Sequence, residues 1–301
     1  MVAAAHFAGT ALACYLTAQV LTRARWPWHS PRVAILCWQA MGLSLGLSVI
    51  GLPVALGLAP YDRGTGRALL ALVGDLAGGR LPADLGPAHL AMVGIGLGVG
   101  SVLLGSTARS LLAASRAQRR HRELLNLVAR DDPAAPGALV LDHPSAAAYC
   151  LPGVRPRVVV SAGTLSLLDR AELAAVLSHE RAHAAERHDL VLLPFTALCR
   201  ALPRAGWLRR AHATVALLVE MRADDRARRQ HTDGSLAAAL LRFATAGPRT
   251  APAGALGLGN RDLDVRVRRL LHAGRPPLVR RTVAMATTGA LVAAPICLFL
   301  S

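Results

Sequence analysis

The residues best suited to chemistry form one short run, His179-Glu180-Arg181-Ala182-His183. Two histidines four positions apart share one face of an α-helix, so both imidazoles can reach a single metal ion. A glutamate beside them can take a proton from a water on that metal. The spacing therefore predicts that His179 and His183 bind one zinc ion and that Glu180 is the catalytic base of a zinc metalloendopeptidase. A solvated, histidine-rich helix is the alternative.

The segment around this run predicts the helix that the chemistry requires. Asp169 and Glu172 have the spacing of a helix N-cap and its capping-box partner. Apolar residues at helical spacing follow the cap and lead into the histidines. We expect a helix from Arg170 to about Arg187, with both histidines on one face.

A second predicted helix, over residues 211–230, offers the remaining ligand. Glu220 and Asp224 lie four positions apart and share a face. Catalytic zinc has three protein ligands and an open position for water, and Glu220 can complete a His-His-Glu set. Asp224 can accept the free N–H of a ligand imidazole, a supporting contact that such sites need. The alternative is an ordinary acidic helix that carries these residues on its solvated side.

A short β-branched run upstream predicts a strand that can hold substrate. Residues 157–161, Arg-Val-Val-Val-Ser, follow a proline. A strand beside the metal helix can bind an extended peptide through backbone hydrogen bonds, which makes Val159 a candidate contact. A core strand without that role is the alternative. Tyr149 and His188 are candidates to contact the substrate or steady the transition state, and each has a purely structural alternative.

Composition places this chemistry in a membrane protein. The 301 residues are 53% hydrophobic and 17% charged, with a mean hydropathy of +0.39, which excludes a disordered tail, a collagen or a coiled coil. Four apolar runs each come close to the ~20 residues that cross a bilayer. They cover residues 2–22, 33–59, 88–114 and 279–301. The first arginine follows the first run, so we expect a membrane anchor and not a signal peptide.

The charge distribution predicts how the chain crosses the membrane. The formal net charge is +16, and all 34 basic residues are arginine. Arginines concentrate in the loop 23–32, after the third run and before the fourth. The positive-inside rule therefore predicts a cytoplasmic location for residues 115–278 and an outside location for both termini. We expect this charge to meet the anionic lipid bilayer and not nucleic acid, because no recognisable nucleic-acid module accompanies it.

The predicted fold class is a mainly α membrane protein with four transmembrane helices. Residues 1–114 form a membrane domain with the first three helices. Residues 115–278 form a cytoplasmic α+β, zincin-like metallopeptidase domain, and residues 279–301 form the fourth transmembrane helix. The middle region is then the soluble part of the chain, and it is long enough to bury a core of its own.

Two segments resemble a known family. Residues 148–183, which include the predicted strand and the HExxH run, and residues 220–227, Glu-Met-Arg-Ala-Asp-Asp-Arg-Ala, resemble the BlaR/MecR family of integral-membrane, gluzincin-type zinc metallopeptidases. The family's order of three membrane helices, a cytosol-facing domain and a fourth helix is similar over nearly the whole chain. HExxH with a downstream ExxxD is also similar to HtpX-like and CAAX-prenyl proteases, and His188 matches a further histidine in those relatives.

The resemblance implies a bacterial, multi-pass protein of the plasma membrane that acts in signal transduction. Its expected substrate is a cytosolic protein or peptide, such as a DNA-binding transcriptional repressor. Antibiotic-sensing members carry a penicillin-binding domain after the fourth helix. This sequence stops at Ser301, so we expect no β-lactam sensing through such a domain. Two alternatives are an HtpX-like protease for membrane-protein quality control and a non-catalytic signal transducer with structural zinc.

Overall fold

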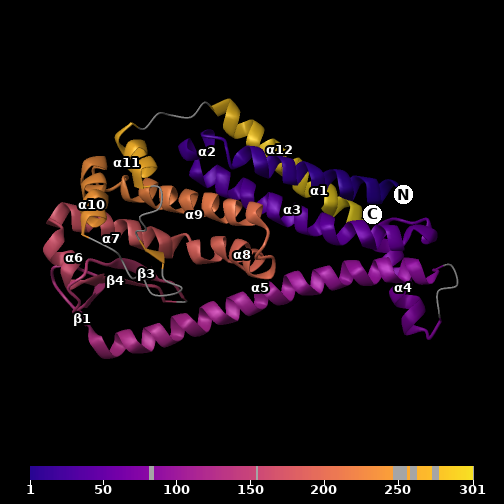
Figure 1. The fold of residues 1–301 in the computed structure, drawn as a ribbon, viewed down its shortest axis with the longest axis horizontal. Coiled ribbons are helices and arrows are strands. Elements are labelled where there is room, and N and C mark those ends of the chain that lie inside the picture. Colours follow the sequence, from indigo (N-terminus) through magenta and orange to yellow (C-terminus); the bar gives the residue numbers. More distant parts are fainter. Residues whose placement is uncertain (81–84, 154, 247–255, 258–262, 273–277, 301) are drawn as a thin grey trace. The chain divides into compact units, whose positions relative to one another are not determined.

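The computed structural model describes residues 1–80, 85–153, 155–246, 256–257, 263–272 and 278–300 (Figure 1). The chain forms two compact units. Unit 1 comprises Met1–Ser106 and Pro276–Ser301, and unit 2 comprises Thr107–Arg275. Helices dominate both units, and the described strands all belong to unit 2.

Unit 1 is built from apolar helices. α1 (Val2–Leu21), α3 (Pro31–Gly57) and α12 (Leu278–Leu300) pack against one another. α5 (Pro87–Val128) begins in this unit and continues into unit 2. The shorter elements of the unit are α2 (Trp26–His29), the 3-10 helix η1 (Ala59–Tyr61) and α4 (Thr65–Ala77).

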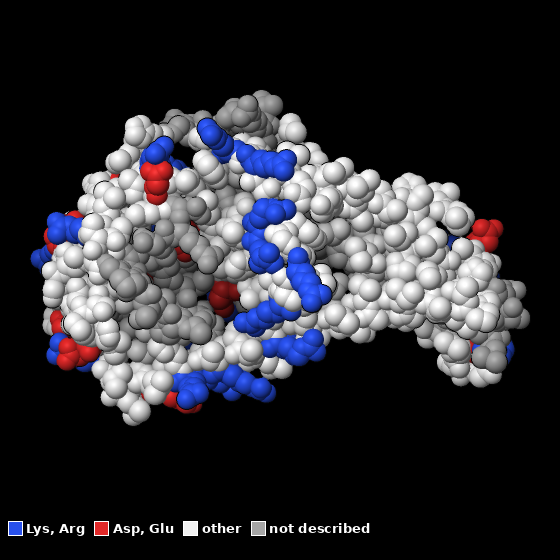
Figure 2. Space-filling model, viewed as in Figure 1, with Lys and Arg blue, Asp and Glu red and all other residues white. Residues whose placement is uncertain are grey.

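Within the described part of the chain, four helices are long and apolar enough to cross a membrane: α1, α3, α5 and α12. Figure 2 shows a broad uncharged surface over the helices of unit 1. α5 continues to Val128, well beyond the predicted apolar run that ends at residue 114. Alanine, leucine and arginine favour helix, so the helix continues after the apolar residues stop. These helices indicate a membrane protein, while the number of crossings and their sidedness stay predictions.

The described strands of unit 2 form a single sheet with the order β1-β2-β4-β3-β5. β2 and β4 are parallel, and the other neighbouring pairs are antiparallel. The strands are β1 (Ala129–Asp131), β2 (Ala138–Leu141), β3 (Ala148–Leu151), β4 (Arg157–Ser161) and β5 (Leu256–Gly257). The β-branched run therefore forms a strand, as the sequence predicts. It lies between two other strands and not at an edge of the sheet.

Helices pack on one face of this sheet and build the core of unit 2. α7 (Arg170–Ala185) packs on β3 and β4, and α9 (Gly206–Ala227) packs against α7. Buried residues of β2, β4, α7 and α10 form one apolar cluster, which includes Val160, Val176 and Leu240. The remaining helices are α6 (Ala162–Leu167), α8 (His188–Ala201), α10 (Asp233–Thr245) and α11 (Leu263–Leu271).

The capping box predicted before the metal helix is confirmed. The Asp169 carboxylate accepts a hydrogen bond from the Glu172 N–H, and the Glu172 carboxylate accepts one from the Asp169 N–H, each at 2.9 Å. α7 begins where the sequence predicts and ends two residues early. Arg187 then adopts a left-handed conformation with φ of 49°, and α8 begins at the next residue, His188. This turn brings the start of α8 back toward the end of α7.

Removing the cap should destabilise unit 2. In Asp169→Ala the Glu172 N–H loses its acceptor, so we expect the free energy of unfolding to fall by about 1 kcal/mol. Thermal unfolding of the purified full chain measures this loss. The control is Asp142→Ala, at an exposed position outside any helix. Equal stability of the two variants would show that the capping box contributes nothing to α7.

Candidate metal centre

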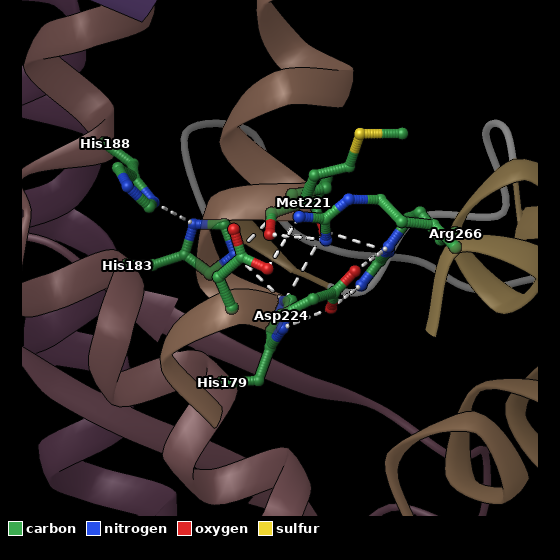
Figure 3. Close-up of polar contacts among 9 residues, drawn as sticks. His179, His183, His188, Met221, Asp224 and Arg266 are labelled. Atoms are coloured by element: carbon green, nitrogen blue, oxygen red, sulfur yellow. Dashed lines mark hydrogen bonds and ion pairs between the residues drawn. The ribbon is translucent and has the colours of Figure 1, made fainter. Parts of the chain in front are cut away.

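Three side chains from two helices of unit 2 converge on one point, and Figure 3 shows two of them, His179 and His183. His179 and His183 lie one turn apart on α7, and Glu220 comes from α9. The two Nε2 atoms are 3.1 Å apart, and each lies 3.5 Å from a carboxylate oxygen of Glu220. Both imidazoles are fully buried. The structure thus brings together the three side chains that the sequence predicts to be metal ligands.

The donor set and its charge fit a zinc ion. Ligand atoms about 2.0–2.1 Å from a tetrahedral ion stand roughly 3.3 Å from one another, which agrees with the separations of 3.1 and 3.5 Å. Two imidazole nitrogens and a carboxylate oxygen are common zinc ligands. Three carboxylates of the described cluster, those of Glu180, Glu220 and Asp224, interact with the single guanidinium of Arg266. A divalent cation would neutralise the remaining negative charge.

Glu180 supplies a buried carboxyl group next to the first ligand. Its side chain is fully buried, and no side-chain donor among the described residues bonds either carboxylate oxygen. Burial, with a smaller contribution from the Glu220 carboxylate, raises the pKa of Glu180 to about 8. A cation at the cluster would lower that pKa again. The result would be a carboxylate ready to accept a proton.

His179 is held from behind by Asp224 and Arg266. Asp224 Oδ1 lies 3.0 Å from His179 Nδ1, the position that the sequence predicts for it. Arg266 Nε and Nη2 donate to the two Asp224 oxygens at 2.9 and 2.7 Å, and its Nη1 lies 3.0 Å from Glu220 Oε2. Burial lowers the pKa of His179, but the contacts with Asp224 and Glu220 outweigh it and raise that pKa to about 9. Arg266 and His179 together hold the pKa of Asp224 below its ordinary value despite burial.

Arg266 is the residue of this cluster that the sequence analysis missed. It lies on α11 and is fully buried, while the two arginines that follow it pair with Asp264 and Asp225. These neighbours make α11 resemble an ordinary solvated helix. The usable signal is spacing, because Arg266 and the buried Leu270 lie four positions apart and share a face. An arginine on the apolar face of a helix needs a buried anion, and here that anion is Asp224.

His188 lies behind the second ligand and not in the position expected of a substrate contact. Its Nδ1 is 2.9 Å from His183 Nδ1, on the side of the ring away from Nε2. Figure 3 shows His188 on the far side of His183 from Asp224 and Arg266. Burial lowers the pKa of both rings, that of His183 to about 3. With 1% exposure, His188 has little surface to offer a peptide. The expected substrate contact of His188 is therefore corrected to a contact with His183.

The structure also corrects the two residues expected to contact substrate from the sheet. Side chains alternate along a strand, and the neighbours of Val159 in β4 take the face toward α7. Val159 and Tyr149 lie on the opposite face, packed with Leu125 of α5. The Tyr149 hydroxyl forms a 2.8 Å hydrogen bond with His121 Nε2, and burial raises the pKa of Tyr149 to about 12. β4 is also paired on both edges, so its backbone has no free edge for a peptide.

A comparison with protein families finds a match to peptidase family M48 over residues 114–271, just over half of the chain. The matched range contains α7, α9 and α11, and hence every residue of the cluster. No curated protein and no solved structure gives a match.

Arg266 should be needed for tight metal binding. Arg266→Met leaves Asp224 and Glu220 without the guanidinium that orients them, so we expect zinc affinity to fall by about 10–100-fold. Arg269→Met is the matched control. Arg269 also links α11 to α9, but its partner is Asp225, at 2.6 Å, whereas the partner of Arg266 is Asp224. Chelator competition with the purified full chain gives both dissociation constants. Because a guanidinium also repels a cation, unchanged or tighter binding in Arg266→Met would contradict this positioning role.

Proposed function

This chain belongs to peptidase family M48, and from that membership we propose that it is an integral-membrane zinc endopeptidase with His179, His183 and Glu220 as metal ligands. Peptidases of this family are zinc-dependent hydrolases. One observation carries the proposal: two imidazole nitrogens and a carboxylate meet within 3.5 Å of one another next to the buried Glu180. This is the donor set of a catalytic zinc site with room for a water.

The residues around the cluster have separate tasks in the proposed reaction. A bound zinc ion would supply a water of lowered pKa and polarise the scissile carbonyl. Glu180 is placed to be the base, whose carboxylate oxygen would accept a proton from the attacking water and return it to the leaving amine. Asp224 and Arg266 keep the His179 ring oriented, since a ligand imidazole needs a partner on its second nitrogen.

The proposed role is regulatory, like that implied by the BlaR/MecR resemblance. The order of elements along the chain supports this role. The apolar helices α1 and α3 precede unit 2, α5 leads into it, and α12 follows it. The substrate proposed is a cytosolic protein such as a DNA-binding repressor. A soluble substrate of this kind requires unit 2 in the cytoplasm and both termini outside the bacterial plasma membrane. The arginine-rich loops favour that orientation.

A second candidate role is membrane-protein quality control of the HtpX-like type. The observation that favours it is His188, which matches a histidine in those relatives and contacts His183 in the structure. A non-catalytic transducer with structural zinc is the less favoured alternative. Structural zinc sites are closed by four protein ligands, whereas the described residues offer a cluster of three.

Substitutions at Glu180 and His183 should distinguish a loss of catalysis from a loss of metal binding. Glu180→Gln removes the base but leaves the ligands, so we expect retained zinc and a loss of cleavage rate of at least about 10²-fold. His183→Ala should lose both zinc and cleavage. The readouts are zinc content of the purified full chain and new protein termini in a mixture of unfolded proteins. Zinc-loaded Glu180→Gln that cleaves like the wild type would contradict the assignment of the base.

The protein N-termini of cells that make the wild type or Glu180→Gln should differ. N-termini found only with the wild type would identify the substrates. A cleaved DNA-binding repressor supports the regulatory role, whereas many fragments of membrane proteins support quality control. Identical N-termini in both strains under several envelope stresses would contradict proteolysis and favour the non-catalytic transducer.

A further inference from the structure

The back of His183 is occupied by a chain of polar groups that the proposed reaction does not use. His188 Nδ1 lies 2.9 Å from His183 Nδ1. On the other side of its ring, His188 Nε2 lies 3.6 Å from Glu186 Oε2. Glu186 in turn accepts two hydrogen bonds from Arg222, at 2.8 and 2.7 Å, and pairs with Arg226 at 3.2 Å. A ligand imidazole thus connects, through a second imidazole, to an arginine-bound carboxylate.

We infer that His188 and Glu186 are positioning residues that hold His183 in the tautomer whose Nε2 is free to bind the metal. The inference rests on the proposed function, because it takes His183 as a metal ligand. It assigns His183 an Nδ1–H that donates to His188 Nδ1. It also assigns His188 an Nε2–H that points toward Glu186.

The direction of these contacts follows from counting protons. A hydrogen bond between two Nδ1 atoms holds one proton, so one ring donates and the other accepts. If His183 donates, its Nε2 has a free lone pair, and His188 presents an N–H to Glu186. If His188 donates, His183 carries its proton on Nε2 and cannot bind a metal there. In that case a bare nitrogen of His188 also faces the Glu186 carboxylate, which is repulsive.

The carboxylate acts on His188 mainly through its charge. A separation of 3.6 Å is longer than a hydrogen bond. His188 is 1% exposed, and in such a poorly solvated place a nearby negative charge strongly favours the tautomer with its N–H on that side. The paired Arg222 fixes the Glu186 carboxylate in place by a two-point contact, the strongest geometry available to this pair.

The backbone places these residues at some cost. Glu186 follows the last turn of α7, and His188 is the first residue of α8. Arg187 between them is one of two non-glycine residues with positive φ in the described chain. A left-handed conformation is unfavourable for such a residue and persists only where its surroundings enforce it. Here the turn directs both flanking side chains to the back of His183.

The arrangement gives the two ligands equivalent support by different routes. Asp224 contacts His179 Nδ1 directly, and Arg266 donates a hydrogen bond to Asp224. No carboxylate among the described residues makes that contact with His183, and His188 with Glu186 takes its place. The ligand set therefore has two supporting carboxylates, each bound by an arginine.

Two substitutions at position 188 distinguish this role from simple space filling. Asn Oδ1 can stand near the place of His188 Nδ1 and accept the hydrogen bond, whereas Leu has similar bulk and no acceptor. In the purified full chain we expect His188→Leu to raise the zinc dissociation constant by about 10–100-fold and His188→Asn by less than about 10-fold. The visible spectrum of the Co²⁺-loaded protein should change in His188→Leu, because a nitrogen ligand is lost or displaced. His121→Leu removes a histidine on the other face of the sheet and should leave both readouts unchanged.

The outcomes separate this inference from the proposed function. Wild-type affinity in His188→Leu, or equal losses in the Leu and Asn variants, would overturn the positioning role while zinc binding by the wild type still stands. If His188→Leu does not fold, Glu186→Gln decides, because its amide accommodates either tautomer of His188. An unchanged dissociation constant in that variant would also overturn the inference. A wild-type protein that binds no zinc contradicts the ligand assignment itself.

Discussion

To bind one metal ion, the buried imidazoles of His179 and His183 must present unprotonated Nε2 atoms to the same point, and the contacts around them in unit 2 serve that requirement. A neutral imidazole can carry its proton on either nitrogen, so its partner on the other side decides which one is free. Asp224 is that partner for His179, and His188 is that partner for His183. Asp224 is a carboxylate bound by Arg266, and Glu186, next to His188, is a carboxylate bound by Arg222. The helices that carry those arginines are therefore part of the proposed metal centre.

Burial of so many charges is costly unless they compensate one another. α7 supplies two of the proposed ligands and the proposed base, α9 supplies the third proposed ligand with Asp224 and Arg222, and α11 supplies Arg266. The sheet supports α7 on one face and forms a second apolar cluster with Leu125 of α5 on the other. A divalent cation would complete the charge balance, so we expect metal binding and the packing of α9 and α11 on α7 to be coupled.

The parts that depend on local spacing were predictable from the sequence. The capping box at Asp169, the histidine pair on α7 and the Glu220–Asp224 pair on α9 each arise from positions three or four residues apart on one helix. That the two pairs meet was expected only because a catalytic zinc needs a third ligand. Arg266 was not predictable in this way, because its partners lie 42 and 46 positions earlier in the chain. Tyr149 was misplaced because spacing alone does not tell which face of a strand meets the metal helix. The long apolar helices were predictable from hydropathy, whereas the predicted sidedness rests on the arginine distribution alone.

Zinc K-edge X-ray absorption of the purified full chain, with and without a hydroxamate, tests the central claim most directly. The account predicts nitrogen and oxygen ligands at about 2.0–2.1 Å, no sulfur ligand, and a change when hydroxamate is added, because a catalytic site keeps one position open. A sulfur ligand at about 2.3 Å, or a spectrum that hydroxamate leaves unchanged, would contradict a catalytic zinc held by two histidines and a glutamate.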